Sequence, residues 1–200
     1  MRILSSALLL LISPLIAAAA PLKVVDVSAP AINCVFNSAC TFTVKDTSDN
    51  IVMSTGGTGF LQSRTFKGAA GSPAAGLFGY EYRLDLRSAV GARSISCIDW
   101  MMISFGPVVS TLNYGGDAKP DQVFVITNGG LGNIGIASAV QTGSSIKFKF
   151  TAPICESRAP GKGDSSFFWG LTSNTQPKFV TATLHETGGA THVVKARSPQ

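Results

Sequence analysis

Residues 76–87 of the chain alternate between large apolar and charged side chains at every second position. The apolar set is Phe78, Tyr80, Tyr82, Leu84 and Leu86. The charged set is Glu81, Arg83, Asp85 and Arg87. A period of two places successive side chains on opposite faces of a β-strand, whereas a helical period would scatter these residues around a cylinder. The segment therefore predicts a half-buried strand, with its apolar face in a core and its charged face in water.

Short strand-like segments separated by turn-forming residues fill most of the remaining chain. Residues 122–127 form a continuous apolar run, residues 146–150 alternate apolar groups with lysine, and residues 46–50 (DTSDN) are predicted to form a turn. Glycine is abundant, with 21 copies, and charged residues make up only 14% of the chain. Roughly a dozen short strands at this spacing predict an all-β fold, an antiparallel two-sheet β-sandwich of the jelly-roll type with almost no helix after the N-terminal segment.

Residues 1–20 have the composition of a secretory signal peptide. Arg2 precedes an apolar run at residues 8–16, and small residues follow up to Ala20, where we expect cleavage. The alternative is an uncleaved membrane anchor, for which the apolar run is barely long enough. We therefore predict a single secreted domain at residues 21–200, extracellular or periplasmic, with no membrane span after cleavage.

The chain contains four cysteines: Cys34, Cys40, Cys97 and Cys155. An even number in an exported chain indicates two disulfides, for which three pairings exist. We predict a local Cys34–Cys40 bond that staples a hairpin of strands at residues 32–36 and 41–45, and a long-range Cys97–Cys155 bond. The alternative, a zinc site, lacks the usual close pairing of cysteine ligands.

The chain is mildly basic, with a formal net charge of +5 that arises from 16 basic and 11 acidic residues. The basic residues are spread along the whole sequence, whereas a nucleic-acid-binding protein would cluster them. We therefore predict no nucleic-acid partner. A weak attraction to anionic glycans or to a cell surface needs only a mild positive field and is consistent with this charge.

Residues 113–121, NYGGDAKPD, resemble the DxNGDGxxD calcium loop of dockerins, thrombospondin-type repeats and FG-GAP repeats. In that family alternate side-chain oxygens and one backbone carbonyl surround the ion. The resemblance implies that Asn113, Asp117 and Asp121 are side-chain ligands of Ca²⁺ and that Lys119 provides its carbonyl.

The loop departs from the family pattern at four positions. Asn113 replaces an aspartate, Gly115 replaces an oxygen ligand, Ala118 replaces the turn glycine, and Phe124 stands where an EF-hand has its bidentate glutamate. The alternative interpretation is a plain turn between two buried strands.

The most conspicuous aromatic run is Phe167–Trp169, which follows a glycine-rich loop. Exposed aromatic rings in extracellular binding modules often stack on sugar rings, so Trp169, together with Trp100 or Tyr114, is a candidate glycan platform. The alternative is that these rings pack in the core, as aromatic residues in strands usually do.

Support for catalysis is thin. The two histidines, His185 and His192, lack the spacing of a metalloprotease helix, and the chain has no G-x-S-x-G nucleophile motif. An extracellular hydrolase, a glycosidase or a peptidase, would have to use a carboxylate such as Asp99 or Glu156. The sequence thus favours a secreted, non-catalytic binding or structural module, with glycans or a cell-surface component as its partner, over such an enzyme.

Overall fold

A computed structural model describes residues 18–106 and 109–199, so most of the predicted signal peptide lies outside the described residues. The described chain forms twelve strands and one helix, α1 (Ala29–Phe36). The strands are β1 (Ala19–Leu22), β2 (Val24–Ser28), β3 (Lys45–Val52), β4 (Thr58–Lys67), β5 (Phe78–Asp85), β6 (Cys97–Ser104), β7 (Val123–Asn128), β8 (Ile136–Thr142), β9 (Ser145–Cys155), β10 (Trp169–Ser173), β11 (Pro177–Glu186) and β12 (Thr191–Pro199).

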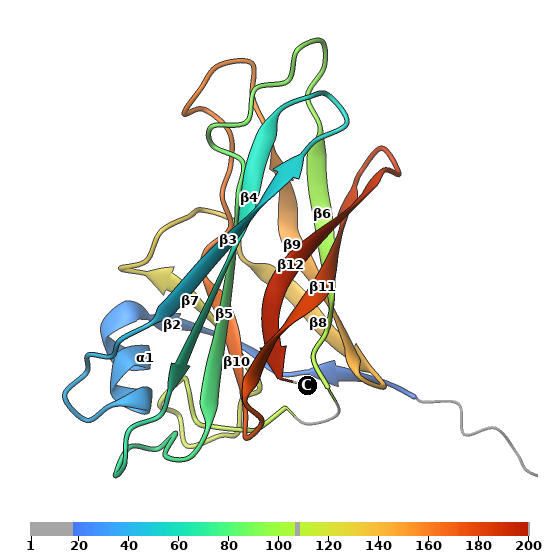
Figure 1. Ribbon diagram of the computed structural model, residues 1–200. Coiled ribbons are helices and arrows are strands. Elements are labelled where there is room, and N and C mark those ends of the chain that lie inside the picture. The colour runs from blue at the N-terminus through green and yellow to red at the C-terminus, as the bar shows by residue number, and fades with distance from the viewer. Residues whose placement is uncertain (1–17, 107–108, 200) are drawn as a thin grey trace, which may run out of the picture.

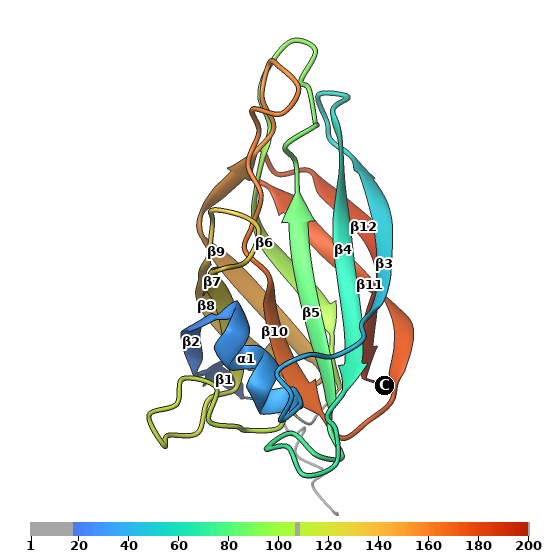
Figure 2. The same ribbon diagram turned by 90° about the vertical axis from the view of Figure 1, so that its left-hand side faces the viewer.

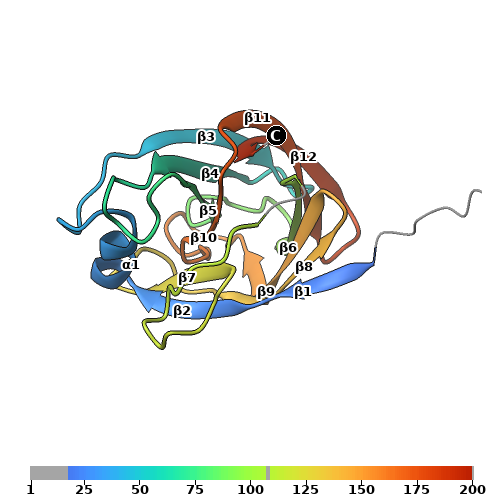
Figure 3. The ribbon, with the colours of Figure 1, turned by 90° about the horizontal axis from the view of Figure 1, so that it is seen from below.

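The strands form two six-stranded sheets that pack face to face (Figures 1 and 3). Sheet A has the order β1-β8-β9-β6-β11-β12, and sheet B has the order β2-β7-β10-β5-β4-β3. The predicted all-β two-sheet sandwich is confirmed. One edge of sheet B departs from the antiparallel pattern, because β2 pairs with β7 in parallel.

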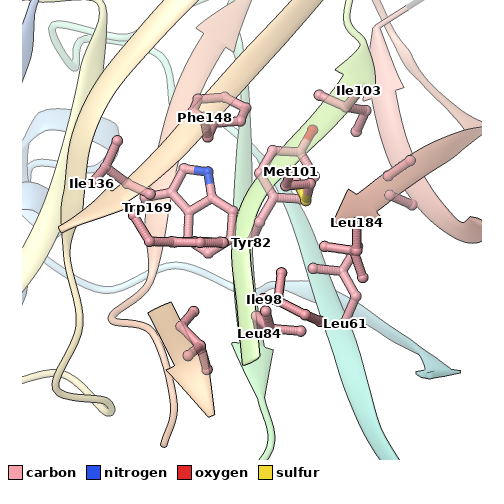
Figure 4. Packing of buried hydrophobic residues seen from close by; sticks show 14 of the residues in the cluster. Leu61, Tyr82, Leu84, Ile98, Met101, Ile103, Ile136, Phe148, Trp169 and Leu184 are labelled. Carbon is pink, nitrogen blue, oxygen red and sulfur yellow. The ribbon is translucent and has the colours of Figure 1, made fainter. Parts of the chain in front are cut away.

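The main core fills the space between the sheets and is centred on Trp169 of β10 (Figure 4). Its indole is fully buried, with ring centroids 5.9 Å from Tyr82 and 5.8 Å from Phe148. Tyr82 has a polar tip, and its hydroxyl donates a 2.7 Å hydrogen bond across the sandwich to the carbonyl of Arg197 in β12. The rings thus bury a large apolar surface, and the Tyr82 hydroxyl still has a hydrogen-bond acceptor.

Strand β5 has the alternation that the sequence predicts, but the face that carries its charged side chains is not exposed to solvent. Tyr80, Tyr82, Leu84 and Leu86 are fully buried, as expected. The opposite side chains Glu81, Arg83 and Asp85 are also at most 5% exposed, which corrects the expectation of a solvated charged face. The outer face of sheet B is buried because other parts of the chain cover it.

A second apolar cluster covers that outer face (Figure 2). Helix α1 contributes Ile32, Val35 and Phe36, which pack against aromatic rings of sheet B. Two glycines make room for these rings, because a Cβ would lie 2.2 Å from the Phe66 ring at Gly79 and 2.5 Å from the Phe124 ring at Gly170. The fold therefore has three layers, which are sheet A, sheet B, and α1 with its loops.

Two local predictions are wrong. The hairpin expected at residues 32–36 and 41–45 is instead helix α1 followed by a turn, with Pro30 in the first helical turn, where its missing N–H costs nothing. Residues 46–50, expected as a turn, lie within edge strand β3, where Thr47 and Asp46 bond to Ser63 and Arg64 of β4.

Both predicted disulfides are present. Cys34–Cys40 joins the end of α1 to the turn that follows it, and Cys97–Cys155 joins directly opposed positions of β6 and β9. Disulfides form and persist in oxidising compartments, which agrees with the predicted location outside the cytosol.

Candidate functional site

The outer face of sheet A carries several exposed side chains. Lys147 and Lys149 of β9 and Lys195 of β12 are exposed on it. The register places the lysines on one face, because Lys147 lies level with Met102, Thr183 and Val193 across the sheet, and Lys195 is two residues from Val193. We call this surface the basic face.

A hollow of about 470 Å³ lies at one end of the basic face. It is lined by Ser104, Phe179, Val180, Thr181 and Lys195. The Phe179 ring is 58% exposed, with the guanidinium of Arg197 4.3 Å from its centroid. The hollow therefore combines an accessible aromatic ring, a cation and hydroxyl-bearing residues. The sequence does not single out Phe179, because it begins an ordinary strand-like run at residues 179–184.

Trp100 lies on the basic face, but its ring faces are occupied. The His185 ring stacks on it at 4.8 Å with an interplanar angle of 9°, and the Lys147 ammonium lies 4.1 Å from the Trp100 centroid. Strand β6 lies between β9 and β11, so the two groups approach the indole from opposite sides. Trp100 thus positions Lys147 and does not offer a bare stacking surface.

The other two rings of the predicted glycan platform are buried. Trp169 is 0% exposed in the main core, and Tyr114 is 2% exposed in the second cluster, where its hydroxyl pairs with Thr172 at 2.8 Å. Burial raises the pKa of Tyr114 above the range in which a phenol normally ionises. A platform that includes Trp169 and Tyr114 is therefore wrong, because their rings are closed to a ligand.

The two carboxylates proposed for a hydrolase lie in different surroundings. Asp99 sits at a bulge of β6 and accepts a 2.7 Å hydrogen bond from Nδ1 of His185. Within the described chain, no hydroxyl or thiol is hydrogen bonded to His185. Neither Asp99 nor His185 lines any of the three described cavities. The pair therefore has no nucleophile among its hydrogen-bond partners in the described chain, and it lines none of these three cavities.

Glu156 is 2% exposed and accepts hydrogen bonds from the Thr55 hydroxyl and from the backbone N–H of Ser96. The Ser96 hydroxyl in turn donates to Glu186 at 2.7 Å, so the two carboxylates share one neighbour. Gly57 leaves room for this arrangement, because a Cβ there would lie 2.1 Å from Oε2 of Glu156. Glu156 thus joins three loops at one end of the sandwich.

Glu186 is the centre of this loop network. It accepts hydrogen bonds from the Ser54 hydroxyl at 2.5 Å, the Ser54 N–H at 2.8 Å, the Ser96 hydroxyl and Nε2 of His192 at 2.6 Å. Burial alone would raise the pKa of Glu186, but these hydrogen bonds outweigh it and lower the pKa to about 2. The carboxylate is therefore ionised at neutral pH and acts as an anchor for the loops.

The loop that resembles a calcium site is organised around a lysine. Asp121 is fully buried and accepts hydrogen bonds from the N–H groups of Tyr114 and Gly115, while Lys23 contacts its other oxygen at 2.8 Å. Asp117 is half exposed and accepts a hydrogen bond from the N–H of Lys119.

The structure gives the calcium interpretation little geometric support. Within the described chain, no group of three or more histidine, cysteine, aspartate or glutamate side chains could hold a metal ion. Asp121 is already engaged by a cation and two N–H groups, and Asn113 has no side-chain hydrogen bond among the described residues. The calcium site stays a prediction, which a titration monitored by melting temperature would test.

Among the described residues, no helix is both long enough and apolar enough to span a bilayer. Comparison with known proteins found no matching family model, no matching curated protein and no matching solved structure.

Proposed function

We propose that the protein is a secreted, non-catalytic binding module that recognises anionic glycans through the basic face. The observation that carries the proposal is the set of exposed lysines, Lys147, Lys149 and Lys195, on one face of sheet A. Lys195 also lines a hollow that contains an exposed aromatic residue and two hydroxyl groups. Hydroxyl groups and an aromatic ring suit a sugar, and ammonium groups suit its carboxylate or sulfate substituents.

The charge balance of this surface favours an anionic over a neutral ligand. The three lysines carry three positive charges on this face, and the one carboxylate of Asp99 offsets them only in part. The lysine ammonium groups stand in water, where their attraction to a ligand is screened by salt. Binding should therefore weaken steeply as ionic strength rises.

The proposal is tested by measuring binding of polygalacturonate, a uronic-acid polymer, with neutral dextran as the comparison. The double variant Lys149→Glu/Lys195→Glu should lose roughly tenfold or more in affinity, because each reversal places a repulsive charge against the polymer. The matched control is Lys45→Glu/Lys162→Glu, which changes the net charge equally outside the basic face and should retain most of the affinity.

Equal losses in the two double variants would show that only the net charge matters and would contradict the proposal. Equal affinity for dextran and polygalacturonate would contradict its anionic part. Both variants change exposed side chains, so their folds should stay intact, which circular dichroism and melting temperature would check.

A hydrolase is the second candidate, because the structure does bring Asp99 and His185 into contact at a bulge of β6. Bulges are frequent beside active sites. Incubation with the same polymer should release no new reducing ends if the protein only binds. Release that His185→Ala abolishes would replace the binding proposal with the enzymatic one.

A further inference from the structure

A cavity of about 350 Å³ lies on the opposite side of the molecule, between helix α1 and the outer face of sheet B. Its apolar walls include Phe42, Ile126, Leu131 and Phe168. Figure 2 looks onto this side, with α1 in the foreground. The volume is at the lower end of the range for small-molecule sites, and the lining is mostly apolar with few polar groups, as in such sites.

The carboxylate of Glu81 faces this cavity without a hydrogen-bond partner. Glu81 is 3% exposed, and none of the described residues donates a hydrogen bond to it or forms an ion pair with it within 4 Å. Its two neighbours across the sheet are Gly170 of β10, which has no side chain, and Arg64 of β4. A buried carboxylate normally accepts hydrogen bonds from nearby donors. The lack of a donor at Glu81 therefore points to a ligand that supplies one.

The two nearby cations are Arg64, which also lines the cavity, and Arg83, and both form contacts with other residues. Arg64 donates to Asp46 of β3 at 3.0 Å, and its guanidinium stacks 4.1 Å from the Phe168 centroid. Arg83, two residues along β5, pairs with Asp85 at 2.9 Å. The part of α1 that faces the cavity offers the neutral amide of Asn33, and residues 42–44 and 129–131 contribute no charge.

Burial raises the pKa of Glu81 to about 7, an effect that Arg64 reduces and Asp46 reinforces. At neutral pH the carboxylate is therefore near the midpoint of its titration. A cation placed against it would favour the ionised form and would release a proton on binding.

We propose that this cavity is a binding site for a small molecule that carries a protonated amine on a compact apolar body. The ammonium group donates to Glu81, and the apolar body packs against Phe42, Phe168 and Leu131. The site lies on the outer face of sheet B, so it is separate from the basic face and does not depend on the glycan proposal.

The test uses 2-phenylethylammonium as the probe and 2-phenylethanol as its uncharged counterpart, with dissociation constants measured by calorimetry or ligand-observed NMR. The ammonium probe should bind the wild-type protein more tightly than the alcohol. Its affinity should rise roughly tenfold between pH 6 and pH 8, because a carboxyl group with a pKa of about 7 passes from mostly neutral to mostly ionised over that interval. The amine itself stays protonated throughout.

Glu81→Gln keeps the shape of the side chain and removes its charge, so the preference for the ammonium probe and the rise with pH should both disappear. Leu131→Ala changes a wall residue that is 51% exposed and should weaken both probes alike while keeping the pH dependence. No binding of the ammonium probe to the folded wild-type protein at millimolar concentration would overturn the proposal. A pH dependence that persists in folded Glu81→Gln would do the same.

Discussion

Folding removes the carboxylate of Glu81 from water without giving it a hydrogen-bond donor among the described residues. A buried ionised group without a hydrogen-bond donor opposes folding, because the interior replaces only part of its hydration. Burial raises the pKa of Glu81 for the same reason, since it favours the neutral form of the carboxyl group. A cationic ligand in the adjoining cavity would supply the missing donor.

The stability of the protein should therefore depend on this one carboxyl group. The pKa of Glu81 is higher in the folded than in the unfolded state, so its contribution to stability falls as pH rises from about 4.5 to about 7 and stays low above that. Glu81→Gln should raise the free energy of unfolding at pH 8 by about 1–3 kcal/mol and have little effect at pH 5. Urea unfolding at the two pH values measures this difference.

Asp26→Asn is a suitable control for this prediction, because Asp26 is an exposed carboxylate on β2. Its effect should remain within about 0.5 kcal/mol at both pH values. A Glu81→Gln protein that is less stable than the wild type at pH 8 would contradict the account of Glu81 as an unpartnered buried charge.

For individual residues, the sequence predicts which side chains of β5 face the main core, but it does not predict that Glu81 is buried. The alternation of residues 76–87 is a local property of one strand. The burial of Glu81 depends on Phe168 and α1, which are distant in sequence and reach β5 only in the folded chain. For the same reason, the exposure of Phe179 and the burial of Trp169 could not be told apart from composition.

The loop network around Glu186 links the two sheets at one end, because it ties the β3–β4 turn of sheet B to β6, β11 and β12 of sheet A. Ser54 belongs to the turn between β3 and β4, Ser96 to the segment before β6, and His192 to β12. Hydrogen bonds to a charged group are stronger than those between neutral groups. One carboxylate therefore fixes three segments at the same end of the sandwich.

Glu186→Gln should reduce the free energy of unfolding by about 1–3 kcal/mol at neutral pH, because charge-assisted hydrogen bonds are lost. The pKa of Glu186 is lower in the folded than in the unfolded state. Its contribution is thus complete above about pH 4.5 and disappears as pH falls towards 2. Urea unfolding from pH 6 down to pH 2 should show wild type and variant converging, and a constant difference over this range would argue against the role of the charge.

The two wrongly predicted elements show where local pattern is a weak guide. Residues 32–36 are apolar and short, and such a run does not distinguish a strand from a buried helix. Contact with the outer face of sheet B decides in favour of the helix, where Ile32, Val35 and Phe36 all point towards aromatic rings. Residues 46–50 are polar enough for a turn, but an edge strand with one side in water accepts polar side chains.

The disulfides differ in how much of the molecule they constrain. Cys34 and Cys40 are 6 residues apart, whereas Cys97 and Cys155 are 58 residues apart and join the centre of sheet A. On the loop-entropy model, the shorter link contributes roughly 2 kcal/mol and the longer one roughly 4 kcal/mol.

Removal of the longer link by Cys97→Ser/Cys155→Ser should therefore destabilise the protein by about 4 kcal/mol, and Cys34→Ser/Cys40→Ser by about 2 kcal/mol. Guanidinium unfolding of the three proteins under the same conditions gives both values. The reverse order would mean that the link at α1 holds more of the fold than its loop length indicates.

The start of the chain lies at the edge of both sheets. Strand β1 pairs with β8 in sheet A, with Ala19 opposite Thr142, and β2 pairs with β7 in sheet B, with Val24 opposite Val123. Strands β1 and β2 therefore wait for their partners until about two-thirds of the polypeptide has emerged. Such distant pairing slows folding. One outer edge of each sheet thus stays open until late in synthesis.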